Sequence, residues 1–227
     1  MKIDMICMRR IFFVLCLFLC SISLFAGFME DELLSAVKDD NLEEVEYLLS
    51  MMVDVNCTNS LGETPLIIAC ERLWTEGVKA LLSSHLVDVD RRDKSGKTAL
   101  IHSIDRQYLE IVKMLVEIGN ADVNLPDMLC GYTPLMHAVL SMNHLMFKFL
   151  LSSGRVNLNA QDIIDGNTVA MLVAKHGELV LMDELIKMSR SIDWRVCNYH
   201  GDDVLSLAIQ NNSIEVVYFW AINHVEV

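Results

Sequence analysis

The residues best placed to do chemistry are two histidines, His102 and His137, which lie at equivalent positions of neighbouring segments. Imidazole is a common zinc ligand, so a repeated pair raises the question of a metal site. Stacked helices, however, lie about 8–10 Å apart, whereas each zinc ligand must come within about 2.1 Å of the ion. No third ligand recurs in the same register. We therefore interpret both histidines as parts of the structural framework and expect no metal-binding residues.

Signatures of catalysis and cofactor binding are missing from the sequence. It contains no Gly-rich phosphate loop, no G-x-S-x-G nucleophile turn and no H-E-x-x-H zinc motif. Serine, histidine and aspartate are all present, but they occupy positions of a repeating framework that explains them structurally. We therefore expect a protein that is not an enzyme, with no catalytic residues, no cofactor-binding residues and no cofactor.

The seven cysteines do not form an obvious disulfide framework. Three of them lie in the N-terminal apolar segment, and the other four are Cys57, Cys70, Cys130 and Cys197. Cys57, Cys130 and Cys197 fall in loops of non-adjacent repeats, while Cys70 falls in a helix. Because the Cα atoms of a disulfide must lie within about 7 Å, we expect no intramolecular pairing.

A unit of about 35 residues recurs along the chain, and it must supply the elements that position these side chains. Its best-preserved copy is Gly131–Val139, with the sequence GYTPLMHAV. The other copies begin at Gly62 (GETPLIIAC), Gly96 (GKTALIHSI), Gly166 (GNTVAMLVA) and Gly201 (GDDVLSLAI). Successive glycines are 34, 35, 35 and 35 residues apart. Self-similarity at this period predicts a solenoid.

Each residue type in this unit has a mechanical role. Glycine allows the positive φ that a tight turn before a helix requires. Two residues later comes a hydroxyl or carboxylate that can cap free helix amides: Thr64, Thr98, Thr133, Thr168 and Asp203. Pro65 and Pro134 follow at the first helical position, where a missing N–H costs nothing. The unit therefore predicts a turn followed by a short helix.

A second half-unit completes the repeat. Residues Ile111–Ile118 predict an amphipathic helix that ends at Gly119, followed by Val123-Asn124. The terminal signature recurs as Val53–Asn56, Val87–Asp90 and Val156–Asn159. Over about residues 30 to 222 the chain resembles the ankyrin repeat family, whose unit is a β-turn and two antiparallel helices. The resemblance implies an all-α repeat solenoid with turn or hairpin tips.

The repeats divide the chain into predicted segments without linkers. An N-terminal cap covers residues 29–58, and its first helix is expected to start at Met29 with Asp31 and Glu32 near its beginning. The repeats follow at about 59–92, 93–127, 128–162, 163–197 and 198–227. Together, residues 29–227 form the predicted ankyrin repeat domain.

Three places depart from the repeat pattern. Leu73-Trp74 replaces the Gly-His pair that the family has between its two helices. In the fourth repeat, Ala170 and Val173 have exchanged large and small residues relative to the other repeats, which indicates a volume-conserving change. The last helix, around Phe219 and Trp220, has almost no polar face. It either folds back on the preceding repeat or forms an interface with another chain.

The first 26 residues have the pattern of a secretory signal. Basic residues near the start precede the uncharged apolar run Ile11–Phe25, and Ala26-Gly27 offers small residues for cleavage. Leu24 is bulky for the third position before the cut. The pattern fits a bacterial exporter, so we expect a periplasmic or secreted protein. The alternatives are an uncleaved membrane anchor, for which fifteen apolar residues are short, and lipidation at Cys20.

Charge narrows the class of partner. The formal net charge is −13, and without residues 1–26 it is −15, from 15 basic and 30 acidic residues. Nucleic acids and anionic membrane surfaces select basic patches, so this balance argues against both. We expect a protein partner instead, and no membrane contact in the mature form.

The loop tips around each glycine are the candidate binding positions, since the resemblance implies that partners bind at the tips and the concave face. The candidate residues are Leu61, Met128, Leu129, Tyr132, Ile163, Ile164 and Tyr199. The third and fourth tips are apolar for solvent-facing turns, unless Ile163 and Ile164 turn inward to cover an inserted residue. We expect an exported scaffold that binds a protein. Alternatives are a protective or inhibitory partner of an exported enzyme, or self-assembly through the apolar C-terminal helix.

Overall fold

The computed structural model describes residues 22–188 and 191–224. The predicted signal segment, apart from its last five residues, and the last three residues of the chain lie outside this range. The chain divides into two compact units, Met1–Asp88 and Val89–Val227. Across the described residues the structure holds twelve helices and no strand longer than the single bridge between Arg92 and Thr98. None of these helices is long and apolar enough to cross a membrane.

The first unit contains two helix pairs. These are α2 (Ile22–Lys38) with α3 (Leu42–Ser50), and α4 (Pro65–Glu71) with α5 (Thr75–Leu82). Helix α2 packs on α4 and α3 packs on α5, so that the two pairs stack in parallel. Its core includes Leu33, Val37, Val45 and Leu48, which are almost completely buried.

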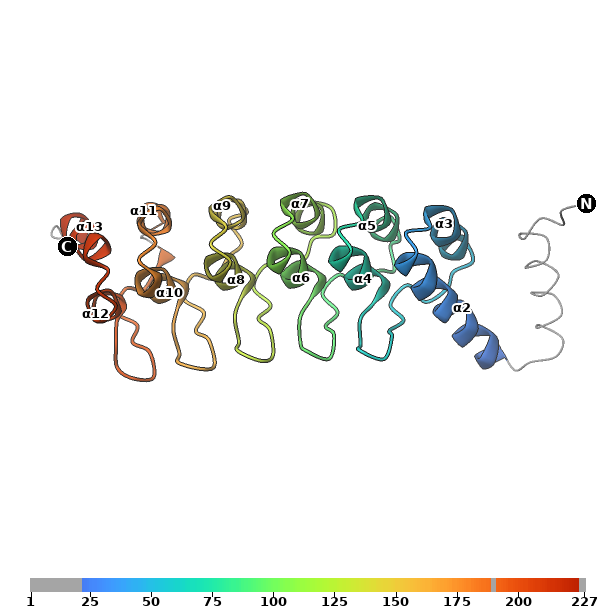
Figure 1. Cartoon of the computed structure of the whole chain (residues 1–227), viewed down its shortest axis with the longest axis horizontal. Coiled ribbons are helices and arrows are strands. Elements are labelled where there is room, and N and C mark those ends of the chain that lie inside the picture. Colours follow the sequence, from blue (N-terminus) through green and yellow to red (C-terminus); the bar gives the residue numbers. More distant parts are fainter. Residues whose placement is uncertain (1–21, 189–190, 225–227) are drawn as a thin grey trace, which may run out of the picture. The chain divides into compact units, whose positions relative to one another are not determined.

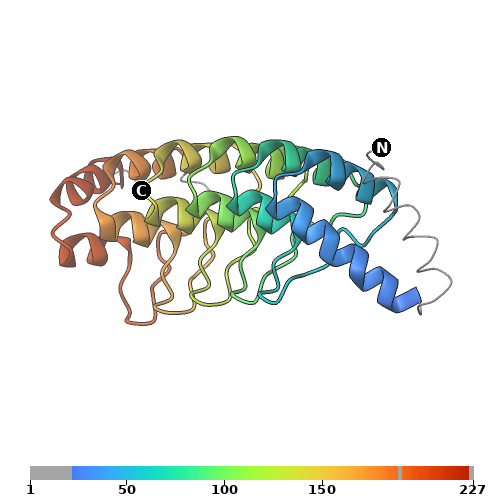
Figure 2. The same ribbon diagram turned by 45° about the vertical axis from the view of Figure 1, so that its right-hand side comes forward.

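The second unit repeats the same pair four times. Its helices are α6 (Ala99–Asp105), α7 (Leu109–Glu117), α8 (Pro134–Leu140), α9 (His144–Ser152), α10 (Val169–His176), α11 (Leu179–Lys187), α12 (Val204–Gln210) and α13 (Ile214–His224). Figures 1 and 2 show the first helices of these pairs in one layer, the second helices in another, and the loop tips on one side. The predicted all-α ankyrin-type architecture is confirmed.

Helix starts follow the local signals of the sequence. The side chains of Thr64, Thr98, Thr133, Thr168 and Asp203 each accept a hydrogen bond from the amide three residues on. Pro65 and Pro134 occupy the first helical position, and the glycines before the threonines have positive φ. Both predictions are confirmed, because capping and turn geometry depend only on neighbouring residues.

Two predicted helix ends are wrong. Helix α2 begins at Ile22 rather than Met29, because the apolar residues before Met29 continue the helix, and Asp31 and Glu32 therefore lie within it. Helix α7 ends at Glu117, but the residue with positive φ is Asn120 (51°) and not Gly119. Asparagine tolerates the left-handed region better than other residues with a β-carbon, so the turn does not require the glycine.

The departure at Leu73-Trp74 is explained by packing. Leu73 adopts a positive φ of 60°, which is uncommon for a leucine. The Trp74 ring lies directly against Gly77, where a β-carbon would collide with it. The indole of Trp74 therefore requires a glycine at position 77, in the first turn of α5.

The Val-x-Val-Asn signature has a role that the sequence did not reveal. Asn124 accepts the N–H of Asn157 (2.6 Å) and donates to the carbonyl of Arg155 (2.8 Å) in the next repeat. Asn56 and Asn159 make the same pair of bonds to the loops that follow them. At the equivalent position, Asp90 accepts the N–H of Asp122 (2.9 Å), and a carboxylate has no N–H to donate. These side chains tie successive loops together.

Candidate functional site

The third and fourth loop tips, Asp127–Gly131 and Asp162–Gly166, are one residue longer than the other tips. One oxygen of Asp127 accepts the N–H groups of Leu129, Cys130 and Gly131 at 3.0, 2.7 and 3.0 Å. Asp162 accepts the corresponding three N–H groups of the fourth tip at 3.0, 2.8 and 3.1 Å. Each longer turn is thus organised around one buried carboxylate, which leaves the two residues after it at the outer end.

Those outer residues are exposed. Met128, Leu129, Ile163, Ile164 and Tyr199 have between 56% and 66% of their surface accessible. We call this set the tip ridge. Because Ile163 and Ile164 both face solvent, the alternative in which they turn inward is wrong. The tip ridge therefore presents apolar side chains from three successive loops.

Neighbouring tips are joined to one another. The N–H of Ile163 donates to the carbonyl of Cys130 (2.9 Å), and the N–H of Tyr199 donates to that of Asp165 (2.8 Å). Met128, Ile163 and Tyr199 each lie against the glycine of the preceding tip, where a β-carbon would collide with them. The exposed side chains therefore stand on a connected, hydrogen-bonded base.

Two of the predicted site residues lie outside the tip ridge. Leu61 is exposed (59%), but it belongs to the first unit, whereas the residues of the tip ridge all belong to the second. Tyr132 is half-buried, and its ring meets that of His137 edge to face at 6.0 Å. Burial raises the pKa of the Tyr132 phenol, and the charge of Asp162 adds to this effect. Tyr132 thus supports the tip more than it extends the exposed surface.

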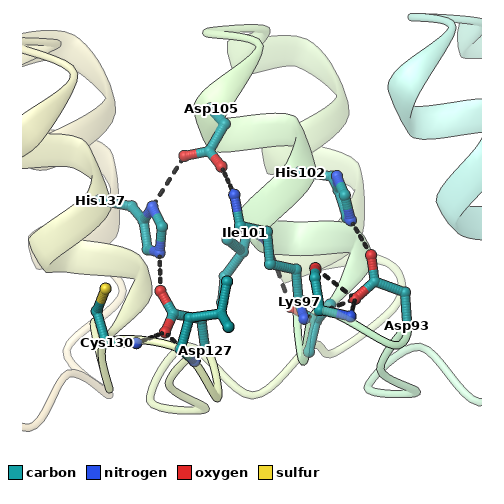
Figure 3. Close-up of polar contacts among 11 residues, drawn as sticks. Asp93, Lys97, Ile101, His102, Asp105, Asp127, Cys130 and His137 are labelled. Atoms are coloured by element: carbon teal, nitrogen blue, oxygen red, sulfur yellow. Dashed lines mark hydrogen bonds and ion pairs between the residues drawn. The ribbon is translucent and has the colours of Figure 1, made fainter. Parts of the chain in front are cut away.

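Beneath the third tip, His137 lies between two carboxylates (Figure 3). Its Nε2 is 2.9 Å from Asp127 of its own tip, and its Nδ1 is 2.8 Å from Asp105 of the preceding repeat. Both ring nitrogens therefore face carboxylate oxygens, which accept hydrogen bonds when ionised. Lys97 also binds Asp105, at 2.6 Å. We call Lys97, Asp105, Asp127 and His137 the carboxylate clasp.

Burial alone raises the pKa of the Asp105 carboxyl, but hydrogen bonds from His137 and Lys97 outweigh it and bring the pKa down to about 2. For Asp127, burial is likewise outweighed by the N–H of Cys130 and by His137, so its pKa lies below the usual range. Both carboxylates are therefore ionised at neutral pH, as the clasp requires.

The other histidine of the repeated pair has a similar place. His102 Nε2 lies 2.8 Å from Asp93, the residue that begins the second tip. The same carboxylate accepts the N–H groups of Ser95 and Lys97 at 2.9 and 3.0 Å. Both histidines are thus framework residues that hold tip carboxylates, as interpreted from the sequence.

The described residues offer no cluster of three or more His, Cys, Asp or Glu side chains that could hold a metal ion. Cys57, Cys130 and Cys197 are free thiols. Burial, together with the charge of Glu30, raises the pKa of the Cys57 thiol to about 12, so this thiol is a poor nucleophile. Only Cys197 is fully exposed.

Sequence reasoning missed two parts of this surface. Asp105 ends a helix one repeat before His137, and no sequence pattern links the two, because their contact depends on how the repeats stack. Asp127 and Asp162 do not stand out in the sequence, because an acidic residue in a turn is ordinary. Their signal was the extra residue before Gly131 and Gly166, which demands a carboxylate able to collect three amides.

Comparison with known proteins agrees with this architecture. The family model for ankyrin repeats (3 copies) matches residues 33–127 and 135–224. The chain belongs to the ankyrin repeat family. Ankyrin repeats are generally protein–protein interaction modules, and the fold is typically a non-enzymatic scaffold.

A solved structure gives the same result for the fold. The crystal structure of the ankyrin repeat domain of Bcl-3, described as a unique member of the IkappaB protein family, is similar to this ankyrin repeat protein. The TM-score is 0.64 at 25% sequence identity, over 82% of this chain and 97% of that one. No curated protein matches the chain.

Proposed function

We propose that this ankyrin repeat protein binds another protein through the tip ridge and the adjoining surface of the first helices, and that it catalyses no reaction. The observation that carries the proposal is the continuous row of exposed apolar side chains on the third to fifth tips. Large apolar residues gathered at loop ends contribute nothing to the core, and such patches usually mark interaction sites.

The construction of the tips supports binding as well. The carboxylates of Asp127 and Asp162 each hold three amides of their own turn, and backbone hydrogen bonds join one tip to the next. A preorganised surface loses little conformational entropy when a partner binds, so more of the contact energy remains as affinity. Tyr199 supplies an aromatic anchor at one end of the ridge.

The test begins with affinity capture of the native partner and its identification by mass spectrometry. Binding of the purified partner is then measured for the double variant Leu129→Asp/Ile164→Asp. We expect its Kd to rise at least 100-fold, because two charges would be buried in an apolar contact.

The matched control is Ile118→Asp/Leu145→Asp, which alters two equally exposed apolar residues (64% and 70%) on other parts of the same unit. It should bind like the unchanged protein, and both variants should keep the thermal midpoint. Equal binding by the two double variants would move the interface away from the tip ridge.

We also propose that the protein is exported, with residues 1–26 as the signal and a periplasmic or secreted mature chain. A protective or inhibitory partner of an exported enzyme is the role that fits this location. The expected cut lies within α2, between Ala26 and Gly27, so cleavage would shorten this helix by its first five residues. N-terminal sequencing of native protein should find Gly27 or a neighbour, whereas an intact Met1 on soluble protein contradicts export. A membrane-retained chain would support the uncleaved anchor.

A further inference from the structure

The last repeat leaves open a face that every preceding repeat of the second unit covers. Ile209 of α12 is 61% exposed. The residues 35 positions apart at the same place in the earlier repeats, Ile104, Val139 and Ala174, are 0%, 1% and 0% exposed. In those repeats the following helix pair packs over the position. Among the described residues, no helix pair covers the side chain at 209, although its counterparts in the earlier repeats are core residues.

Two further positions show the same change. Leu205 is half-buried, whereas Leu100, Leu135 and Ala170 at its place are at most 1% exposed. On α13, Val217 is half-buried, whereas its counterparts Val112, Phe147 and Met182 are completely buried. A hollow between the two helices is lined by Ile209, Ser213, Ile214, Val217 and Tyr218. We call Leu205, Ile209, Ile214, Val217 and Tyr218 the C-terminal face.

The outer side of α13 is also apolar where its neighbours are polar. Tyr218 (69% exposed) occupies the place of Lys113, Lys148 and Asp183 in the three earlier repeats. One turn on, Ile222 (72% exposed) occupies the place of Glu117, Ser152 and Lys187. The repeat framework does not require apolar residues at these positions, since charged or polar residues occupy them in three other copies. Their presence indicates a surface that is covered.

Charge indicates what covers it. Among the described residues of α12 and α13, Glu215 is the only acidic or basic residue apart from His224. Residues 27–88, in contrast, contain 3 basic and 13 acidic residues, a formal charge of −10. A second copy that docked its N-terminal unit on this apolar face would have to desolvate carboxylates there, which is costly. A second copy that docks its own C-terminal face brings together the least charged parts of both chains.

We propose that two copies of this protein associate through their C-terminal faces in a two-fold symmetric dimer. In such an isologous contact, each copy supplies the helical layer that the next repeat supplies inside the array. Tyr218 lines the hollow and is 69% exposed, so in this contact the Tyr218 of each copy packs on the hollow of the other. Aromatic residues of this kind dominate the binding energy of small interfaces.

The test uses the full chain in the cells that produce it. Tyr218 is replaced by a photo-reactive p-benzoylphenylalanine, with the same replacement at Leu145, an equally exposed residue of α9 (70%), as control. Irradiation should convert the Tyr218-substituted chain into a species of twice its own mass, which is 25.7 kDa for the uncleaved chain and less after cleavage, and leave the control monomeric. Mass spectrometry should find both linked peptides within residues 204–224.

A second change tests the contact separately from folding. Ile209→Asp in the photo-reactive chain should reduce the cross-linked dimer at least tenfold, while the circular dichroism melting curve stays unchanged. Ile118→Asp, and the tip variant Leu129→Asp/Ile164→Asp, should leave the cross-link intact, which separates this proposal from partner binding at the tips. Absence of a dimer, a cross-link to α2 or α3 of the second copy, or a cross-link to a different protein would each overturn the proposal.

Discussion

At the scale of single residues, the tip surface depends on carboxylates that are buried and satisfied. Asp127 has four such contacts, because one of its oxygens accepts the N–H groups of three residues of its turn and the other contacts Nε2 of His137. Nδ1 of His137 in turn contacts Asp105 in the preceding repeat. A series of hydrogen bonds therefore connects the exposed residue Leu129 to the neighbouring repeat.

Replacing Asp127 with alanine should destabilise the protein by about 2–4 kcal/mol, because it leaves three amides of the turn and Nε2 of His137 without their acceptor. Urea unfolding at neutral pH measures the change. The control Asp183→Ala removes an exposed carboxylate paired with Lys187 and should cost at most about 1 kcal/mol. Equal losses for the two variants would show that Asp127 does not organise the tip.

Acid should weaken the clasp in a defined window. The folded pKa of Asp105 is about 2, below the unfolded value of about 3.9, so its stabilisation is complete above that value. It is lost as the pH falls from about 4 towards 2, because the unfolded chain takes up the proton first. Asp105→Asn has no such proton to bind, so its urea midpoint should fall less steeply between pH 4 and 2. Parallel curves for the variant and the unchanged protein would rule out this contribution.

At the scale of elements, the tips are stacked units in which the first exposed residue rests on a glycine of the tip before it. A β-carbon at Gly131 would lie 2.8 Å from the backbone nitrogen and from Cγ2 of Ile163, and the glycine has a φ of +72°. Gly154 has a similar φ of +66°, but open space around its α-carbon. These two glycines separate backbone strain from the collision between tips.

Gly131→Val should destabilise the protein by about 3–5 kcal/mol, from left-handed strain of about 1–3 kcal/mol and a clash with the next tip. Gly154→Val should show the strain alone, at about 1–3 kcal/mol. Denaturant melts give the two values, and hydrogen exchange should report the loss in the repeats of both α6 and α10, since neighbouring repeats are coupled. Identical destabilisation by the two variants would mean that the contact between neighbouring tips adds nothing to the backbone strain.

The asparagines that tie successive loops together, Asn56, Asn124 and Asn159, are interrupted by Asp90, which only accepts a hydrogen bond. Asp90→Asn should stabilise the protein by about 0.5–1.5 kcal/mol, because the amide can donate to the following loop as Asn124 and Asn159 do. Asp122→Asn makes the same charge change where the side chain accepts only the N–H of Asn124, and it should be neutral. Thermal unfolding compares the two variants, and a lower midpoint for Asp90→Asn would show that an amide at this position does not stabilise the following loop.

At the scale of the whole molecule, charge is distributed very unevenly, with a formal −10 on residues 27–88. Glu46 is exposed on α3, three residues after Glu43, and like charges at this spacing repel each other. Glu46→Lys should therefore raise stability by about 0.3–0.5 kcal/mol at low salt. In 1 M salt the Debye length is about 3 Å, so the gain in melting temperature should disappear. A gain that survives high salt would have another cause.

What the sequence by itself determined about this ankyrin repeat protein is the part that depends on near neighbours. The capping residues Thr98 and Thr133, the prolines and the turn glycines set the register of the helices without help from the rest of the chain. The period of about 35 residues set the order of the repeats. The apolar tip residues Met128, Leu129, Ile163 and Ile164 could be chosen as exposed because tips project from the helix layers. The start of α2 at Ile22 and the end of α7 at Glu117 differ from what this local reasoning predicts.

The tertiary structure decided what depends on distance between repeats. His137 and Asp105 meet only because α6 and α8 stack in one register, and no spacing in the sequence requires that contact. Tyr132, which the sequence places at a loop tip, is half-buried because its ring packs edge to face on that of His137. Ile209 has the same residue type as the buried Ile104, and it is exposed because no described helix pair covers it. Exposure is a property of what lies next to a residue in space, so sequence alone could not supply it.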